Sequence, residues 1–277
     1  MKVVGENRLE SSVLMLSIHK SGSTLLDKMA KSICEKKNIS YFSPPNFFFS
    51  KGVKRDEWES DPDNIAFMSN NFGVVWSGFR VYGELAETYA LSQVAAGKSL
   101  RVIVLIRDPR DAFVSRYYST IFSHKLPGEG DARDQFLKNR ENALQMDLDT
   151  FCERQIAAYR NRTGLAYNLE CLLDGADKLK DSGVPVSIYR YEDIIFSKYY
   201  WVNSLCRDMG LPDNLTLDKE ELHAIALQHD ILPTIENVNA HVRNVSPGDH
   251  ARKLQLETIS NLNEALMPLL LRCGYSY

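Results

Sequence analysis

Short runs of consecutive apolar residues recur along the chain, separated by stretches in which apolar residues return every three or four positions. The clearest runs cover residues 13–18, 101–106 and 185–190, and a weaker one covers 74–76. Runs of this length without polar alternation are typical of strands buried on both faces of a parallel sheet. These four runs therefore predict the central strands of the fold.

The stretches between the runs predict helices. Residues 22–37 place Leu25, Leu26, Met29 and Ile33 at helical spacing. Further helices are predicted over 84–96, 109–122, 131–182 with interruptions near Gly164 and Gly175, 197–209, and 251–272. Because strands alternate with helices, we expect right-handed crossovers and one parallel sheet with helices on both faces.

Two segments show no period. Residues 41–71 are rich in proline, asparagine, aspartate, serine and aromatic residues, which predicts a long surface segment over one end of the sheet. Residues 237–249 are predicted to form a loop. No internal repeat or linker divides the sequence, so we expect one helix-rich α/β domain over residues 1–277.

The charge of the chain excludes one class of partner. The sequence has 33 Lys and Arg against 36 Asp and Glu, giving a net charge of −3. A chain without a basic excess does not hold nucleic acid by bulk charge. The apolar fraction of 44% and the charged fraction of 25% are those of an ordinary globular protein.

The spacing of the cysteines and the length of the apolar runs indicate whether to expect a metal site or a membrane-spanning segment. The five cysteines are scattered and form no CxxC or Cys/His pair at ligand spacing, so we expect reduced thiols and no metal site. The longest apolar run, 265–271, contains Pro268 and is too short to cross a bilayer. No secretory signal is visible. These features predict a cytoplasmic protein.

A cluster of small, hydroxylated and basic residues follows the first predicted strand, namely His19, Lys20, Ser21, Gly22, Ser23 and Thr24. A strand that turns into a helix through such residues leaves backbone N–H groups at the positive end of the helix dipole, which is an anion site. The alternative is a Ser/Thr helix cap with an incidental lysine. Because Lys20 precedes Gly22, the Walker pattern is absent, which disfavours ATP or GTP hydrolysis.

A second candidate anion site follows the strand at 101–106. Arg107 ends this strand, and Ser115 lies two turns into the next helix. Ligands of open α/β sheets bind outside the carboxyl ends of the strands, so both residues should face the same crevice as Lys20. A guanidinium fork with a nearby hydroxyl suits a phosphate group. The alternative is an Arg–Asp cluster that caps the helix.

In this order and spacing, the two segments resemble those of the sulfotransferases that use 3′-phosphoadenosine 5′-phosphosulfate (PAPS). In that family a K-[ST]-G-[ST]-T loop holds the 5′-phosphosulfate and an R-x(7)-S segment holds the 3′-phosphate. By this resemblance, residues 20–24 would bind the first group, and Arg107 with Ser115 would bind the second. Leu25 stands where cytosolic members carry a tryptophan against the adenine.

Two more matches extend the resemblance to residue 249. Tyr191 follows the strand at 185–190, where the cytosolic enzymes have a tyrosine that contacts adenine. Arg243, Asn244 and Val245 begin a segment that resembles the R-K-G-x-x-G-D loop over the 3′-phosphate. The resemblance implies a P-loop-like topology and sulfuryl transfer to a hydroxyl group. The second product would be 3′-phosphoadenosine 5′-phosphate (PAP), and no metal is required.

The resemblance also suggests catalytic residues. Lys20 would neutralise the leaving group. Cytosolic members have a catalytic histidine in the region that corresponds to residues 76–84, where this chain has none. His124 is therefore the first candidate for the general base and Glu84 the second, because other branches of the family use a glutamate. Arg80 could help to neutralise the sulfuryl oxygens.

The remaining histidines receive no catalytic role. His19 stands where cytosolic members usually have proline, and we expect its backbone to serve the loop more than its ring. The others are scattered without shared spacing and stay unassigned, namely His223, His229, His241 and His250.

Two alternatives to a sulfotransferase follow from the same sequence. One is a P-loop-type kinase or NTPase, and the other is a catalytically silent nucleotide-binding protein, which the missing histidine would allow. Aromatic residues in 41–49 and at 117–118 indicate a partly apolar acceptor pocket, or else core packing or a homodimer contact. The acceptor hydroxyl could belong to a small molecule, a lipid, a carrier-bound group or a glycan.

Overall fold

A five-stranded parallel sheet forms the centre of the computed structural model, which describes residues 1–233, 235–240 and 242–276. The strand order is β2-β3-β1-β4-β5, so β1 lies in the middle. The strands are β1 (Ser12–Ser17), β2 (Tyr41–Phe42), β3 (Val75–Phe79), β4 (Leu100–Ile106) and β5 (Val186–Arg190). All four apolar runs are confirmed as strands.

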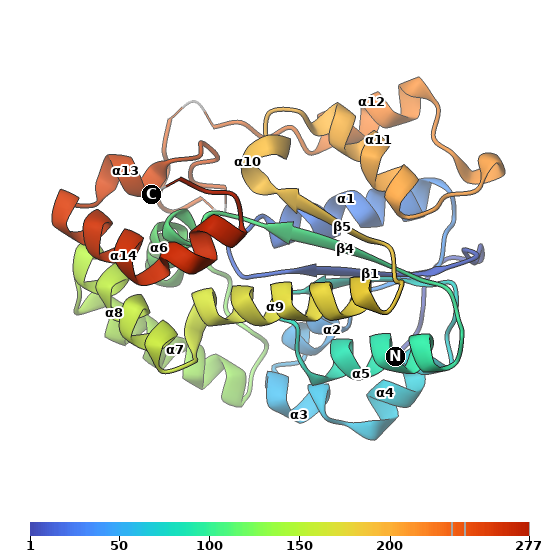
Figure 1. The fold of residues 1–277 in the computed structure, drawn as a ribbon, viewed down its shortest axis with the longest axis horizontal. Helices are drawn as coiled ribbons and strands as arrows, with labels where there is room; N and C mark the ends of the chain where they lie inside the picture. The colour runs from blue at the N-terminus through green and yellow to red at the C-terminus, as the bar shows by residue number, and fades with distance from the viewer. Residues whose placement is uncertain (234, 241, 277) are drawn as a thin grey trace.

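Helices cover both faces of the sheet (Figure 1). One face is covered by α1 (Ser23–Lys36), α10 (Tyr191–Ile194), α11 (Lys198–Asp208) and α12 (Lys219–Gln228). The other is covered chiefly by α5 (Glu84–Ala95), α6 (Pro109–Tyr118), α8 (Leu148–Arg160), α9 (Gly164–Asp181) and α14 (Leu256–Arg272). Short helices α2 (Pro44–Ser50), α3 (Arg55–Glu59) and α4 (Pro62–Ser69), with α7 (Asp131–Leu144) and α13 (Asp249–Lys253), complete the helical shell.

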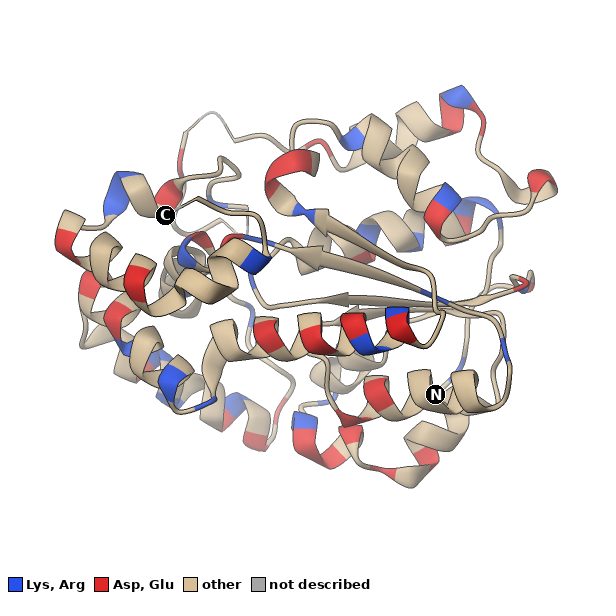
Figure 2. Ribbon diagram, in the orientation of Figure 1, with Lys and Arg blue, Asp and Glu red and all other residues tan. Residues whose placement is uncertain are grey.

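Alternate residues of the central strands belong to two separate hydrophobic cores, one on each face of the sheet. Leu14 and Val104 belong to the core on the α9 side, whereas Val13 and Ile103 belong to the core on the α1 side. Successive side chains of a strand point to opposite faces, so a strand covered on both sides must be apolar throughout. The strands are accordingly almost uncharged, and the charges lie on the helices and loops (Figure 2).

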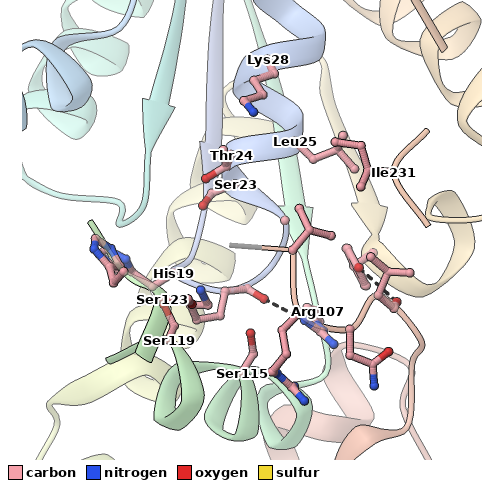
Figure 3. Close-up of a pocket in the computed structure, with 18 of the residues that line it drawn as sticks. His19, Ser23, Thr24, Leu25, Lys28, Arg107, Ser115, Ser119, Ser123 and Ile231 are labelled. Carbon is pink, nitrogen blue, oxygen red and sulfur yellow. Dashed lines mark hydrogen bonds between the residues drawn. The ribbon is translucent and has the colours of Figure 1, made fainter. Parts of the chain in front are cut away.

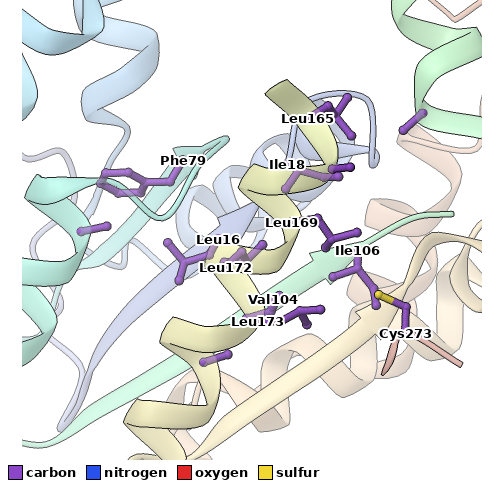
Figure 4. Packing of buried hydrophobic residues seen from close by; sticks show 14 of the residues in the cluster. Leu16, Ile18, Phe79, Val104, Ile106, Leu165, Leu169, Leu172, Leu173 and Cys273 are labelled. Atoms are coloured by element: carbon purple, nitrogen blue, oxygen red, sulfur yellow. The ribbon is translucent and has the colours of Figure 1, made fainter. Parts of the chain in front are cut away.

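Helix α9 illustrates this packing. Leu165, Leu169 and Leu172 lie along one side of the helix and face Leu16 and neighbouring strand residues (Figure 4). Gly175 does not interrupt the helix as predicted. Its missing side chain makes room for Tyr82, because a Cβ there would lie 2.2 Å from the tyrosine ring. The predicted interruption near Gly164 is confirmed as the start of α9.

The expectation of a long surface segment at 41–71 is wrong. This segment contains β2, α2, α3 and α4. Pro44 and Pro62 occupy the first helical positions of α2 and α4, where a missing N–H costs nothing. The rings of Phe48 and Trp58 stack with centroids 5.2 Å apart, so the aromatic residues pack together. Helices this short cannot display a hydrophobic period.

Three other boundaries differ from the sequence-based expectation. Helix α6 ends at Tyr118 and continues as a π-helical turn over Ser119–Ser123. The helix predicted over 251–272 is divided into α13 and α14. Helix α12 was not predicted, although Asp218 and Glu221 form a capping box at its start. The parallel, P-loop-like α/β class is confirmed, and no helix of the described ranges is both long and apolar enough to span a membrane.

Candidate functional site

A cleft with a volume of about 510 Å³ lies beyond the carboxyl ends of β1, β4 and β5. Its walls come from the loop between β1 and α1, from α6 and the π-helical turn, from the start of α10, and from residues 242–245. This edge is where open parallel sheets bind ligands, because the loops after neighbouring strands converge there. The two segments singled out from the sequence do face one crevice.

Most of the residues proposed from the sequence line this cleft. They are Lys20, Gly22, Ser23, Thr24, Leu25, Arg80, Arg107, Ser115, His124, Tyr191, Arg243, Asn244 and Val245. Two do not. Ser21 is buried and its hydroxyl donates to the carbonyl of Ile18 at 2.8 Å, so it shapes the loop. Glu84 is exposed at the first turn of α5, outside the cleft, which removes the support for its role as a base.

The loop after β1 is shaped by two residues with positive φ. Lys20 has φ of 70° and Gly22 has φ of 90°. A Cβ on Gly22 would approach the Cδ2 atom of Tyr191 to 2.9 Å, so only glycine fits without displacing that ring. Helix α1 then begins at Ser23, and Figure 3 shows the hydroxyls of Ser23 and Thr24 at the cleft. The first N–H groups of α1 and these hydroxyls form a donor surface for an anion.

Arg107 lies directly beside this loop. Its side chain is 5% exposed, and it donates to the carbonyl of Lys20 at 3.3 Å. The guanidinium carbon lies 4.4 Å from the ring centroid of Tyr191, and Asp111 is 3.6 Å away. The Nε atom of Arg107 is buried and has no hydrogen-bond partner among the described residues. Ser115 lies below Arg107 in the same wall (Figure 3).

The segment at 242–250 closes the same side of the cleft. Arg243 lies 4.3 Å from the ring centroid of Tyr118 and forms ion pairs with Glu236 and Asp249. Asn244 donates to Asp249 at 3.1 Å. His241, which received no role from the sequence, lies outside the described residues.

Tyr191 joins the loops of the cleft. Its hydroxyl donates to the carbonyl of Val245 at 3.1 Å, while its ring packs between Gly22 and the guanidinium group of Arg107. The residue lines the cleft, as expected, but its hydroxyl is already used within the protein. Tyr191 therefore aligns three segments of the site.

Lys20 is surrounded by other cations. Desolvation, together with the charges of Arg107, Arg80 and Arg243, lowers the pKa of Lys20 to about 8. No carboxylate forms an ion pair with Lys20 among the described residues, so the loop concentrates positive charge. Such a lysine binds most favourably to a ligand that carries negative charge.

One end of the cleft holds two histidines, and we call it the histidine end. It consists of His19, Arg80, Ser119, Ser123, His124 and Lys125. Figure 3 shows His19, Ser119 and Ser123 to the left of Arg107, with Leu25 and Ile231 above it. His19 lines the cleft, and the expectation that its backbone serves the loop more than its ring stays a prediction. Desolvation and the charges of Arg80 and Arg116 hold the pKa of His19 well below its usual range.

His124 is held in one tautomer. Its Nδ1 atom donates to the carbonyl of Lys125 at 2.7 Å, which leaves Nε2 as a free acceptor. The ring lies between Phe49 and Phe136, with centroid distances of 5.9 and 4.9 Å. Desolvation and the charges of Lys20 and Arg80 lower the pKa of His124, although the hydrogen bond to Lys125 opposes this. The ring is therefore neutral near pH 7 and can accept a proton.

Arg80 is positioned by a buried polar network. It donates to the side-chain oxygen of Asn46 at 3.2 Å, and Asn46 donates to Asp27 at 2.7 Å. Asp27 is buried and also accepts a hydrogen bond from Tyr41 at 2.5 Å. This network fixes the direction in which Arg80 leaves the end of β3.

Several residues of the site were not identified from the sequence. Asn46, Lys28 and Lys125 line the cleft without belonging to a recognisable motif, whereas Phe49 is one of the aromatic residues in 41–49 that indicated an acceptor pocket. His250 contacts Asp111, which lies in the first turn of α6, four residues after Arg107. Among the described residues, no three His, Cys, Asp or Glu side chains gather at metal-binding distance.

Comparison with known proteins identifies the family. No protein with a curated description matches this sequence. The structure of mouse sulfotransferase SULT7A1 complexed with PAP matches with a TM-score of 0.57 and 14% identity, over 94% of this chain and 85% of that one. Retinol dehydratase in a complex with retinol and PAP gives a TM-score of 0.44 and 13% identity, over 95% and 82% of the two chains. The first likeness is one of fold, and the second is too low to carry an argument.

The decisive match is to a family model. The model described as a sulfotransferase domain matches residues 10–226, which is more than half of the chain. This range includes the loop at 19–24, Arg107, Ser115 and Tyr191, and it ends before Arg243. The chain therefore belongs to the sulfotransferase family.

Proposed function

We propose that this protein transfers the sulfuryl group of PAPS to a hydroxyl group of an acceptor and releases PAP. The observation that supports this most is the joining of two anion-binding regions in one cleft. The loop that carries Lys20 and the helix that carries Ser115 are linked through Arg107, whose guanidinium group donates to the carbonyl of Lys20 at 3.3 Å. Two separated anion sites suit a nucleotide with phosphate groups at both ends.

The residues present fit such a nucleotide. None of the described residues that line the cleft is an aspartate or glutamate, although the chain as a whole has a net charge of −3. Arg107 keeps a buried Nε atom without a partner, which is costly unless a ligand satisfies it. Arg107, Ser115 and Arg243 would hold the 3′-phosphate, and residues 20–24 would hold the 5′-phosphosulfate. Leu25 and Tyr191 would border the adenine.

Lys20 would stabilise the leaving group. PAPS supplies the sulfuryl group, whose sulfur gains a bond to the acceptor oxygen while its bond to the bridging oxygen of the 5′-phosphate breaks. The Lys20 ammonium group and the first N–H groups of α1 would neutralise the charge that develops on that oxygen. Removing one donor of this kind typically slows turnover about 10²–10³-fold.

His124 would accept the proton of the acceptor hydroxyl. Its Nε2 atom is free because Nδ1 donates to Lys125, and its lowered pKa keeps the ring neutral near pH 7. Arg80, at the same end of the cleft, would neutralise the sulfuryl oxygens. The proton thus passes from the hydroxyl to His124 while the negative charge passes to PAP.

A transfer assay tests this proposal. The protein is incubated with PAPS and a panel of phenols, alcohols and sugars, and both PAP and the sulfated product are measured by mass spectrometry. We expect both to form in equal amounts and to depend on Lys20, with Lys31→Ala as the control because Lys31 is an exposed residue of α1. Consumption of ATP in place of PAPS would favour a kinase or NTPase. Binding of PAP without any transfer would favour a catalytically silent protein.

A further inference from the structure

The three arginines that line the cleft, Arg80, Arg107 and Arg243, differ in their partners. Arg107 lies 3.6 Å from Asp111, and Arg243 forms ion pairs with Glu236 and Asp249. These arginines belong to the part of the cleft proposed to hold the nucleotide. Each therefore already has a carboxylate that offsets part of its charge in the free protein.

The cations at and beside the histidine end have no such partner. Arg80 and Lys125 line the cleft, and among the described residues the only hydrogen-bond acceptor of Arg80 is the neutral amide oxygen of Asn46. The carboxylate of Asp27, whose charge acts on Arg80, is already bonded to Asn46 and Tyr41. No ion pair joins Arg80 or Lys125 to a carboxylate within the ranges that the structure describes.

Arg116 adds a third unpaired cation beside this end. It lies on α6, one residue after Ser115, and is half-buried. Within the described part of the chain its guanidinium group has neither a hydrogen bond nor an ion pair. Burial lowers the pKa of Arg116, and no carboxylate opposes this effect. Its charge lies close enough to Lys20 and His19 to lower the pKa of both.

This arrangement is unfavourable in the free protein. Arg80 and Arg116 are half-buried, so their like charges repel each other and lose hydration, and an anion bound nearby would offset both costs. The single charge of a sulfuryl group is already met by Lys20 and the start of α1. Arg80 would serve the sulfuryl oxygens as well, but Arg116 and Lys125 exceed what the proposed nucleotide requires.

We propose that the acceptor carries an anionic group, a carboxylate or a phosphate, in addition to its hydroxyl group. Lys125, which lines the cleft, would bind this group, and Arg116 would add its charge from beside the cleft. Arg80 would lie between the group and the sulfuryl oxygens, and Phe49 would supply an apolar wall. This inference rests on the proposed sulfotransferase function and restricts it to one class of substrate. Neutral phenols and alcohols would be poor acceptors.

Matched acceptors of equal size test the inference. We would compare 4-hydroxyphenylacetate with 4-hydroxyphenylacetamide, and 6-hydroxyhexanoate with its amide, measuring kcat/KM with PAPS and thermal stabilisation in the presence of saturating PAP. The anionic member of at least one pair should be favoured about tenfold or more, which is the usual worth of a hydrogen bond to a charged group. This preference should weaken at roughly 0.5 M salt. The inference would be overturned if the anion and the amide gave equal kcat/KM and equal thermal stabilisation in both pairs. It would also be overturned if none of the four compounds bound.

Two variants link the preference to the proposed residues. Lys125→Gln and Arg116→Gln should each reduce the anion preference about threefold or more while leaving the affinity for PAP within about twofold. Lys125 is exposed, so its variant is expected to fold even if the Arg116 variant does not. Lys180→Gln, on the distant helix α9, is the control and should leave the preference unchanged. An unchanged preference in Lys125→Gln would count against the inference.

The outcomes also separate this inference from the proposed function. If PAP binds and neutral acceptors are sulfated as well as anionic ones, the sulfotransferase function stands and the inference about the acceptor is wrong. If PAP neither binds nor forms, the proposed function itself has failed. The two failures therefore have different signatures in the same set of experiments.

Discussion

Asp111 and His250 lie 139 residues apart in the chain, yet Nδ1 of His250 donates to Oδ1 of Asp111 at 2.6 Å. The same carboxylate accepts the backbone N–H groups of Gly248 and His250 at 2.8 and 2.9 Å, and it lies 3.6 Å from Arg107. One buried side chain thus joins the end of β4 to the segment that closes the cleft. Both sides of the proposed 3′-phosphate site depend on it.

Asp111→Asn should therefore weaken the fold and the site together. Removing one partner from a buried charged network typically costs about 3–5 kcal/mol, and we expect a loss of unfolding free energy of that order with a weaker affinity for PAP. Asp174→Asn is the control, because Asp174 pairs with Arg272 at 2.6 Å on the surface, where an ion pair contributes at most about 1 kcal/mol. Equal losses in the two variants, measured by urea unfolding, would refute the structural role of Asp111.

The pH dependence of stability checks the same residue. Burial would raise the pKa of Asp111, but the hydrogen bonds from His250 and the charge of Arg107 outweigh it and lower the pKa well below its usual range. A lowered carboxylate pKa stabilises the fold at pH values above the unfolded pKa of about 3.9, and this contribution is lost as the pH falls further. The stability difference between wild type and Asp111→Asn should shrink as the pH falls below about 4. A difference that stays constant would contradict this assignment.

Binding of PAP should take up protons near pH 8. The pKa of Lys20 is about 8 in the free protein, so part of the population is uncharged there, and a bound anion favours the charged form. Calorimetry in buffers of different ionisation enthalpy should show net proton uptake at pH 8 and little at about pH 6. Lys20→Met should abolish the uptake. Proton uptake that persists in this variant would assign it to another group.

Gly22→Ala should weaken the affinity for PAP more than the same change at Gly183. Both glycines have positive φ, 90° and 82°, so each alanine incurs backbone strain of about 1–2 kcal/mol. Only at Gly22 does the new Cβ meet the ring of Tyr191, at 2.9 Å, whereas nothing lies within 4 Å at Gly183. We expect similar losses of stability but a weaker affinity for PAP only in Gly22→Ala. Equal PAP affinities would show that the contact with Tyr191 does not shape the loop.

His124→Gln should lower kcat about 10²–10⁴-fold, as expected for the loss of a general base, and leave the affinity for PAP unchanged. Because the pKa of His124 is lowered, the wild-type rate should fall only when the pH is below 6.5, the usual histidine value. His19→Gln is the matched variant, since His19 lies at the same end of the cleft. A larger loss of kcat in the His19 variant would assign the base to His19.

The sequence predicts the centre of this fold well, because strands buried on both faces must be apolar throughout. For the same reason Lys20 and Arg107, which follow such strands directly, could be placed in one crevice. The short helices within 41–71 could not be predicted, since a seven-residue helix such as α2 shows no period. Ser21 was misjudged because a hydroxyl that turns inward to Ile18 looks the same in sequence as one that turns outward.

The acceptor side of the site was harder to predict because it depends on contacts between distant segments. Glu84 lies close to Arg80 in sequence, but the chain turns into α5 between them and leaves the glutamate outside the cleft. His124 reaches the cleft because α6 is extended by a π-helical turn. No residue pattern in the sequence predicts this turn. That Arg116 forms no ion pair within the described residues likewise becomes visible only in three dimensions.

The most direct test of the central claim is a calorimetric titration of PAP and of adenosine 5′-phosphate into the wild-type protein and Arg107→Gln. The account predicts that the wild type binds PAP about tenfold or more tightly than the nucleotide without a 3′-phosphate, and that Arg107→Gln removes most of this difference. Equal affinity of the wild type for the two nucleotides, or no binding of PAP, would contradict it.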